Sequence, residues 1–156
     1  MVTTAITQRR PASLPGRGDG GRELSVYVLF TGVHATLDAV HEAAALAREL
    51  GASISLVYTA RVPWPLPLDE PPVNLDFMRR RFHALADDCA VELRFEIVVC
   101  RDTVPALNMT LPRPSLILIG GPRRWWPTRE RRLGRALERA GHHVIFVNSK
   151  KEHSHA

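Results

Sequence analysis

The amino-acid sequence predicts an α/β protein built on one five-stranded, mainly parallel sheet in a Rossmann-like, three-layer α/β/α arrangement. Short apolar runs alternate along the chain with segments in which apolar residues recur at helical spacing. Two of these runs, residues 116–119 and 144–147, contain no polar residue, which is typical of strands buried on both faces of a parallel sheet. The 156 residues suffice for one domain with a sizeable core. Strands that alternate with helices form parallel sheets with helices on both faces.

Five strands and four helices are expected along the chain. The expected strands span residues 23–30, 53–58, 91–100, 115–119 and 143–147. The expected helices span residues 37–50, 75–89, 102–111 and 128–140. A proline-dense stretch, residues 62–73, excludes regular structure between the second strand and the second helix.

Local signals place the ends of some of these elements. Thr36 precedes the first helical pattern and is expected to cap it. Gly51 follows the last turn of the same helix, in the position where glycine commonly ends a helix. Polar and apolar residues alternate over the first half of the third strand, so we expect that strand at an edge of the sheet.

The two ends of the chain are expected to lie outside a domain of residues 23–148. Residues 1–22 are rich in Pro, Gly, Ser and Thr and lack periodicity, which predicts a disordered leader, and residues 149–156 predict a flexible tail. No apolar segment approaches the ~20 residues that cross a bilayer, and the first residues lack the apolar stretch of a signal peptide. We therefore expect a cytoplasmic protein with no membrane partner, in which Cys89 and Cys100 are free thiols.

The net charge of +5 is concentrated in one segment. Seven arginines and two glutamates lie between Pro122 and Gly141, so seven minus two, or five, accounts for the whole excess. A localised basic segment, here residues 123–139, favours an anionic partner. The alternative for its helical part is a solvated face whose charges pair three or four residues apart. The seven arginines are Arg123, Arg124, Arg129, Arg131, Arg132, Arg135 and Arg139.

Glycines and polar residues follow two of the expected strands. The fourth strand is followed by Gly120 and Gly121, and a glycine pair there permits a sharp turn and close approach of a ligand to backbone amides. Thr31, Gly32 and His34 follow the first strand. Ligands of parallel sheets lie beyond the carboxyl ends of the strands, where the strand order reverses. We therefore expect a candidate ligand site between these two loops, with His34 as either a titrating group or a solvent-facing residue.

The order of elements, and above all the block LILIGG…RRLGRALERAGHHVIFV, resembles the universal stress protein family over residues 23–148. The resemblance implies a fold similar to that of the adenine nucleotide alpha hydrolases, and a role in the stress response. In the branch of the family that binds ATP, the fourth strand ends in a Gly-x-x-Gly turn. A glycine and a Ser or Thr follow about nine residues later, and an Asp follows the first strand.

The motif matches this chain unevenly. Gly120 corresponds to the first glycine of the turn, and Gly134 lies close to the position of the later glycine. Arg123 stands where the second turn glycine is expected, Arg135 replaces the Ser or Thr, and Thr31 replaces the Asp. The resemblance therefore implies a degenerate nucleotide site, with ATP or another adenine nucleotide as the candidate cofactor.

Three functions follow as expectations. The first is a non-enzymatic stress-response module of the universal stress protein type with a degenerate nucleotide site. The second is an ATP-binding protein with slow hydrolysis or phosphotransfer, in which Arg123, Arg124 and Gly134 contact the nucleotide. The third is an adaptor that binds an acidic protein or nucleic acid through residues 123–139. Nucleic acid is the less expected partner, because aromatic residues in that segment are confined to Trp125 and Trp126.

Two further expectations concern the surroundings of the site. If an adenine nucleotide binds, its base is expected near residues 58–60 or 99–101. A homodimer is expected through residues 144–148, because an apolar terminal strand followed by a polar tail leaves an edge that a second copy can pair. The family resemblance implies the same antiparallel pairing of fifth strands. The spacing of polar residues predicts no catalytic group and no metal site.

Overall fold

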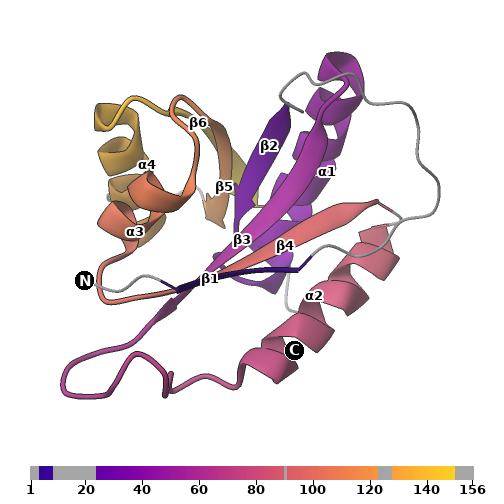
Figure 1. Ribbon diagram of the computed structural model, residues 1–156. Coiled ribbons are helices and arrows are strands. Elements are labelled where there is room, and N and C mark those ends of the chain that lie inside the picture. Colours follow the sequence, from indigo (N-terminus) through magenta and orange to yellow (C-terminus); the bar gives the residue numbers. More distant parts are fainter. Residues whose placement is uncertain (1–3, 9–23, 90, 123–127, 150–156) are drawn as a thin grey trace, which may run out of the picture.

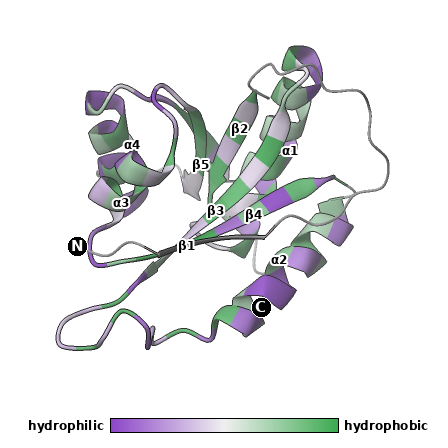
Figure 2. Cartoon of the chain, viewed as in Figure 1, coloured by the Kyte–Doolittle hydropathy of each residue, from purple (hydrophilic) through white to green (hydrophobic). Residues whose placement is uncertain are grey.

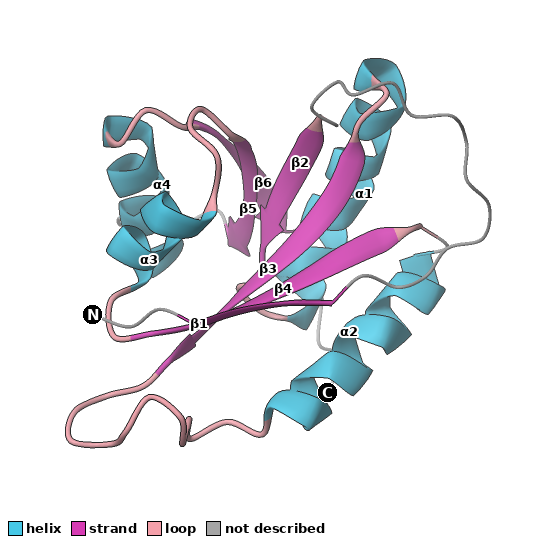
Figure 3. Ribbon diagram, in the orientation of Figure 1, coloured by secondary structure: helices cyan, strands magenta, loops and turns pink. Residues whose placement is uncertain are grey.

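The computed structural model describes residues 4–8, 24–89, 91–122 and 128–149. They form a six-stranded sheet in the order β1-β4-β3-β2-β5-β6, covered by helices on both faces (Figures 1 and 3). The strands are β1 (Thr4–Gln8), β2 (Ser25–Leu29), β3 (Ser53–Arg61), β4 (Leu93–Cys100), β5 (Leu116–Pro122) and β6 (His143–Ser149). The helices are α1 (Val33–Leu50), α2 (Leu75–Cys89), α3 (Thr103–Thr110) and α4 (Arg129–Arg139).

The five strands from β2 to β6 run parallel to one another, which confirms the predicted parallel sheet. The chain passes from the central β2 outward to β3 and then to β4. It then returns to β5 on the other side of β2 and continues outward to β6. The strand order therefore reverses between β2 and β5. This reversal fixes where a ligand of such a sheet would lie.

The sixth strand was not expected. β1 lies antiparallel to β4, with Thr4 opposite Val99 and Gln8 opposite Phe95. The prediction that residues 1–22 form a disordered leader is therefore wrong for these five residues. The physical reason is that β4 is the outermost parallel strand, and an uncovered strand leaves amides and carbonyls for another segment to pair with. Residues 9–23 and 150–156 lie outside the described residues.

The core consists of two clusters of buried side chains, one on each face of the sheet. The cluster under α1 and α2 includes Val28, Leu56 and Phe82, and the cluster under α3 and α4 includes Leu107 and Leu137. Figure 2 shows hydrophobic and hydrophilic residues alternating along α2 and α4, as in helices with one buried face. Among the described residues, no helix combines the length and apolar character that a membrane span requires.

The start of α1 differs from the prediction in a way that shapes the site. The helix begins at Val33, and Thr36 lies buried inside its first turn instead of capping it. The Thr36 hydroxyl oxygen accepts a hydrogen bond from the backbone N–H of Thr31 at 3.2 Å. This bond fastens the segment after β2 to the helix. The helix ends as expected, with Gly51 in the left-handed region at φ 63°.

A buried histidine ties together the opposite end of the sheet. His142 Nδ1 accepts a hydrogen bond from the backbone N–H of Ser115 at 3.2 Å. Its Nε2 lies 3.2 Å from Asn108 Oδ1, an acceptor, so Nε2 carries the proton and the ring is neutral. Burial, and to a lesser extent the charge of Arg113, lower the pKa of His142 below its usual value.

The lowered pKa of His142 predicts how stability depends on pH. As the pH falls below about 6.5, the unfolded chain takes up a proton on this imidazole before the folded chain does. The neutral His142 ring therefore contributes its full share to the free energy of unfolding above that pH. This share is lost as the pH falls toward the lower pKa of the folded state. Urea unfolding at pH 7.5 and 5.5 should show a smaller loss of stability for His142→Gln than for the wild type. An equal loss of stability in His142→Gln and in the wild type would contradict the prediction.

Candidate functional site

The two segments expected to form the site meet at the reversal of strand order. The Thr31 hydroxyl, just after β2, donates a hydrogen bond of 2.7 Å to the backbone carbonyl of Gly120 in β5. β2 and β5 are neighbouring parallel strands, so their carboxyl ends share one edge of the sheet (Figure 1). The structure thus brings Thr31, Gly32 and Gly120 together at the switch point of the fold, where sheets of this kind bind ligands in a crevice outside the strand ends.

The α1 side of this crevice favours an anion. No side chain caps the first turn of α1, and no acidic residue lies in that turn. The first N–H groups of a helix have no partner within the helix, and its amino end carries a partial positive charge. Gly32 precedes the helix in extended backbone with φ 159°, and the His34 side chain is exposed. A carboxylate or phosphate at this corner would meet backbone amides.

The β5 side of the crevice differs from the expectation. Gly120 does not begin a turn, because β5 continues to Pro122 and Gly120 pairs with Val147 in β6. A Cβ atom at Gly120 would lie 2.0 Å from the backbone oxygen of Ala35 in α1. The space beside Gly120 therefore holds the backbone of α1, and the expected contact of Gly120 with a ligand stays a prediction. The absence of a side chain lets the helix come directly against the strand end.

Gly121 faces a carboxylate-bearing side chain. It pairs with Asn148 in β6, and a Cβ atom there would make ordinary contacts of 3.6 Å with Cβ and Cγ of Glu130. Glu130 lies in the first turn of α4, where the helix dipole favours an acidic residue. A negative charge beside Gly121 opposes a phosphate at the same place. No pattern in the sequence indicates this contact, since Glu130 was expected only to pair with neighbours three or four residues away.

The later glycine of the motif also has a structural role. Gly134 is buried in α4, and a Cβ atom there would lie 2.3 Å from the ring of Phe146 in β6. The glycine therefore lets α4 lie close to the sheet, and the expected contact of Gly134 with a nucleotide stays a prediction. Arg135, the next residue, is exposed on α4. Arg123 and Arg124 lie outside the described residues, so their place in the site stays a prediction.

Aromatic side chains occupy the first region expected for an adenine base. The Tyr58 ring lies in edge contact with Phe30 and Phe82, with centroid distances of 5.7 and 5.6 Å. Burial raises the pKa of the Tyr58 phenol, which keeps it neutral. Beside this cluster a small, mainly apolar pocket of about 170 Å³ opens between α1 and α2. It is lined by Phe30, Val33, Leu37, Arg81, Phe82, Ala84, Leu85 and Asp88.

The second region expected for the base, residues 99–101, is also committed to other contacts. Val99 and Cys100 are buried in the sheet. Arg101 reaches over the loop that follows β3, and its Nη1 donates a 2.6 Å hydrogen bond to the carbonyl of Leu66. Its role in the described structure is therefore to hold that loop. Sequence reasoning missed this role, because the partners lie 35 or more residues away along the chain.

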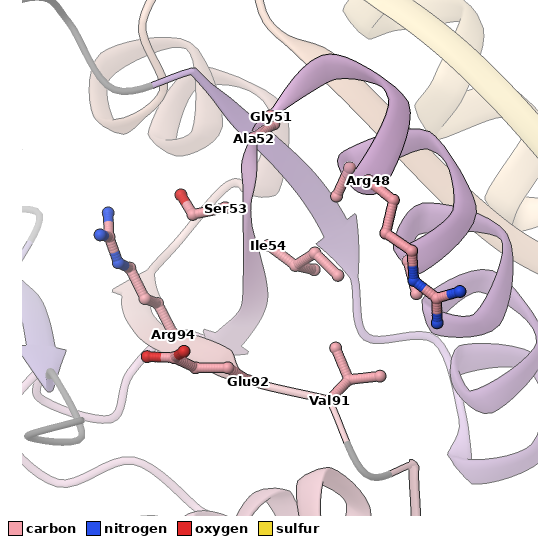
Figure 4. A pocket seen from close by; sticks show the side chains of 10 residues that line it. Arg48, Gly51, Ala52, Ser53, Ile54, Val91, Glu92 and Arg94 are labelled. Atoms are coloured by element: carbon pink, nitrogen blue, oxygen red, sulfur yellow. The ribbon is translucent and has the colours of Figure 1, made fainter. Parts of the chain in front are cut away.

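A groove also lies at the other end of the sheet. It has a volume of about 460 Å³ and opens where α1 ends and where β3 and β4 begin, with Arg94 and Glu92 on one side and Arg48 on the other (Figure 4). This is the amino end of the strands, opposite to the end at which parallel sheets bind ligands. The lining also carries both signs of charge, so it selects no class of ligand.

Other reactive groups offer no competing site. Cys89 and Cys100 are free thiols, as predicted, and burial raises the pKa of both, so neither is an activated thiolate. Within the described ranges, no three His, Cys, Asp or Glu side chains gather closely enough to hold a metal ion.

No protein-family model matches the sequence, and no curated protein is significantly similar to it. The resemblance to the universal stress proteins therefore stays a hypothesis, which rests on the motif residues and on the order of the elements. The fold itself rests on the structure.

The two crevice glycines can be tested against each other. Gly120→Ala should destabilise the protein by about 1–3 kcal/mol, because the added methyl group overlaps the Ala35 carbonyl and α1 must move. Gly121→Ala should change stability by less than about 0.5 kcal/mol, because its methyl group meets only ordinary contacts. Urea unfolding followed by circular dichroism measures both. Equal losses in the two variants would contradict the assignment of Gly120 to helix packing.

Proposed function

We propose that this chain is a non-enzymatic, cytoplasmic stress-response module of the universal stress protein type, with a degenerate nucleotide site at the β2–β5 switch point. The observation that supports it most is the hydrogen bond from Thr31 to Gly120, which joins the two strand-end segments where the strand order reverses. The uncapped amino end of α1 borders the same crevice and favours an anionic group.

The proposal that the site is degenerate has its own support. The backbone of Ala35 occupies the space that a Cβ atom would fill at Gly120, and the ring of Phe146 occupies the corresponding space at Gly134. Glu130 places a carboxylate-bearing side chain beside Gly121. Glycine amides that cradle a triphosphate need open space and no neighbouring negative charge. Among the described residues, both glycines that correspond to the motif, Gly120 and Gly134, are thus closely approached by protein atoms.

Thermal unfolding with adenine nucleotides tests this proposal. We expect millimolar ATP or AMP to raise the Tm by less than about 1 °C. A functional ATP site at a hundredfold excess of ligand over Kd would add about 2.7 kcal/mol, or several degrees. A shift of that size would favour the ATP-binding alternative instead. In that case Arg123→Ala together with Arg124→Ala should abolish the shift, and a shift that survives the double variant would place the phosphates elsewhere.

One observation favours a second candidate, an adaptor that binds an acidic protein. The helix α4 exposes a row of arginines spaced three or four residues apart, so they lie on one side of the helix. None of them forms an ion pair with a carboxylate in the described part of the chain. Unpaired guanidinium groups in a row attract an anionic surface. The row consists of Arg129, Arg132, Arg135 and Arg139.

We also propose that two copies pair through β6. In the described residues, β6 is the last strand of the sheet and pairs only with β5. Ile145 in this strand is 37% exposed, so the edge presents an apolar side chain as well as unpaired amides. Antiparallel pairing of two identical edges would satisfy both with a self-complementary contact.

Ile145→Lys tests the dimer. The exposed position should tolerate the lysine in the folded monomer, whereas two lysines brought together at the paired edge would repel each other. Sedimentation velocity at tens of micromolar should show a dimer for the wild type and a monomer for this variant. Met109→Lys, at a 70% exposed apolar position on α3, is the matched control and should stay dimeric. A monomeric wild type would rule out the dimer.

A further inference from the structure

A proline-rich loop between β3 and α2 extends from the body of the protein (Figure 1). Apolar side chains are exposed at the start of this loop. Trp64 is 79% exposed and Leu66 is 39% exposed, and the prolines between and beside them are exposed as well. We call residues 63–67 the Trp64 knob. An indole carries a large apolar surface that folded proteins usually cover.

The knob is held firmly despite its exposure. The Nη1 atom of Arg101 donates hydrogen bonds to the carbonyls of Val62, Pro63 and Leu66, at 3.1, 3.2 and 2.6 Å. The N–H of Leu66 closes a turn by donating to the carbonyl of Pro63 at 3.0 Å. Val62 is fully buried, and its N–H donates to the carbonyl of Cys100 at 2.8 Å. The loop is thus fastened to the end of β4.

The same arginine orients the indole. The central guanidinium carbon of Arg101 lies 3.9 Å from the centroid of the Trp64 ring, within the range of a cation–π contact. One side chain therefore fixes both the backbone of the knob and its most exposed ring. A rigid exposed ring loses little conformational entropy when a partner covers it. Trp and Arg are also the residues that most often dominate binding energy at protein interfaces.

Charge indicates what kind of partner fits. Arg61 is exposed, and its Nε donates a 3.1 Å hydrogen bond to the carbonyl of Arg101, so two cations lie beside the knob. Neither arginine forms an ion pair within the described residues. Asp69 and Glu70 follow the knob on the same loop and are exposed, which disfavours an anionic bilayer as the partner. An apolar cleft with carboxylates at one rim matches the knob.

We propose that the Trp64 knob is a preorganised docking point for a partner protein, with Trp64 inserted into an apolar cleft and Arg61 and Arg101 facing carboxylates at its rim. The proposal does not depend on the nucleotide site proposed at the switch point, which lies beyond the ends of other strands. An experiment can therefore contradict one of these two proposals and leave the other unaffected.

Selection of binders from a library of designed ankyrin-repeat proteins tests the proposal, because their randomised positions line a concave surface. The bait is the full chain. Most selected binders should lose affinity by about tenfold or more for Trp64→Ala and should keep it for Met109→Ala, an equally exposed apolar position on α3. Their randomised positions should be enriched in Asp and Glu over the starting library, and Arg61→Gln should weaken them. The Tm of each bait variant should equal that of the wild type, which excludes misfolding as the cause.

Three outcomes would overturn the proposal. The first is a set of binders that bind wild type and Trp64→Ala equally well. The second is self-association of the wild-type chain in sedimentation velocity that Trp64→Ala abolishes, which would make a second copy the occupant. The third is Trp64-dependent co-sedimentation with phosphatidylcholine and phosphatidylglycerol vesicles, which would make a bilayer the occupant.

Discussion

The close contact between the first turn of α1 and the end of β5 determines how the two halves of this fold meet. β2, β3 and β4 lie on one side of the switch point and β5 and β6 on the other, so the halves are joined at β2 and β5. Gly120 lets the Ala35 backbone lie against the strand, and the Thr31 hydroxyl bonds to the Gly120 carbonyl. A larger residue at position 120 would lift the helix. Under the function that we propose, this contact between α1 and β5 is also a physical reason for the degenerate nucleotide site.

Gly134 shows the same use of glycine on the other face of the sheet. The ring of Phe146 takes the space that a Cβ atom would fill, and the guanidinium of Arg131 lies 5.3 Å from the centroid of that ring. The helix α4 is thereby held close to β6 while its arginines stay at the surface. Removing the ring to open a ligand path would cost the apolar contacts that attach α4 to the sheet. Both motif glycines in the described residues therefore stabilise the fold.

The sequence was informative where a single physical rule applied. Hydrophobic periodicity located the five parallel strands and four helices, and the bounds of α2 were predicted to the residue. The strand β1 was not predicted, because five residues of mixed polarity carry too little periodicity to indicate a strand. These residues pair with the edge of β4, which is far away in sequence. The packing roles of Gly120 and Gly134 were not predicted for a different reason. Glycine is required where a backbone amide contacts a phosphate, and it is equally required where one element packs closely against another. The three-dimensional structure is needed to distinguish a glycine that contacts phosphate from a glycine that permits close packing.

The contacts of Arg101 with loop carbonyls could not be predicted from the sequence either, since no sequence motif indicates them. They matter for how the molecule could act, because they hold the Trp64 knob, which is one of the two surfaces that we propose as docking sites. The other is the edge of β6. The edge strand β6 lies at one side of the sheet, and the Trp64 knob follows β3 near the other. A dimer paired through β6 would leave both knobs uncovered and hold them at a fixed separation. Two linked docking points can raise avidity by about 10²–10⁴ over a single one without any new contact. In that arrangement dimerisation would tune partner binding, and the central sheet would serve mainly to fix the distance between the two knobs.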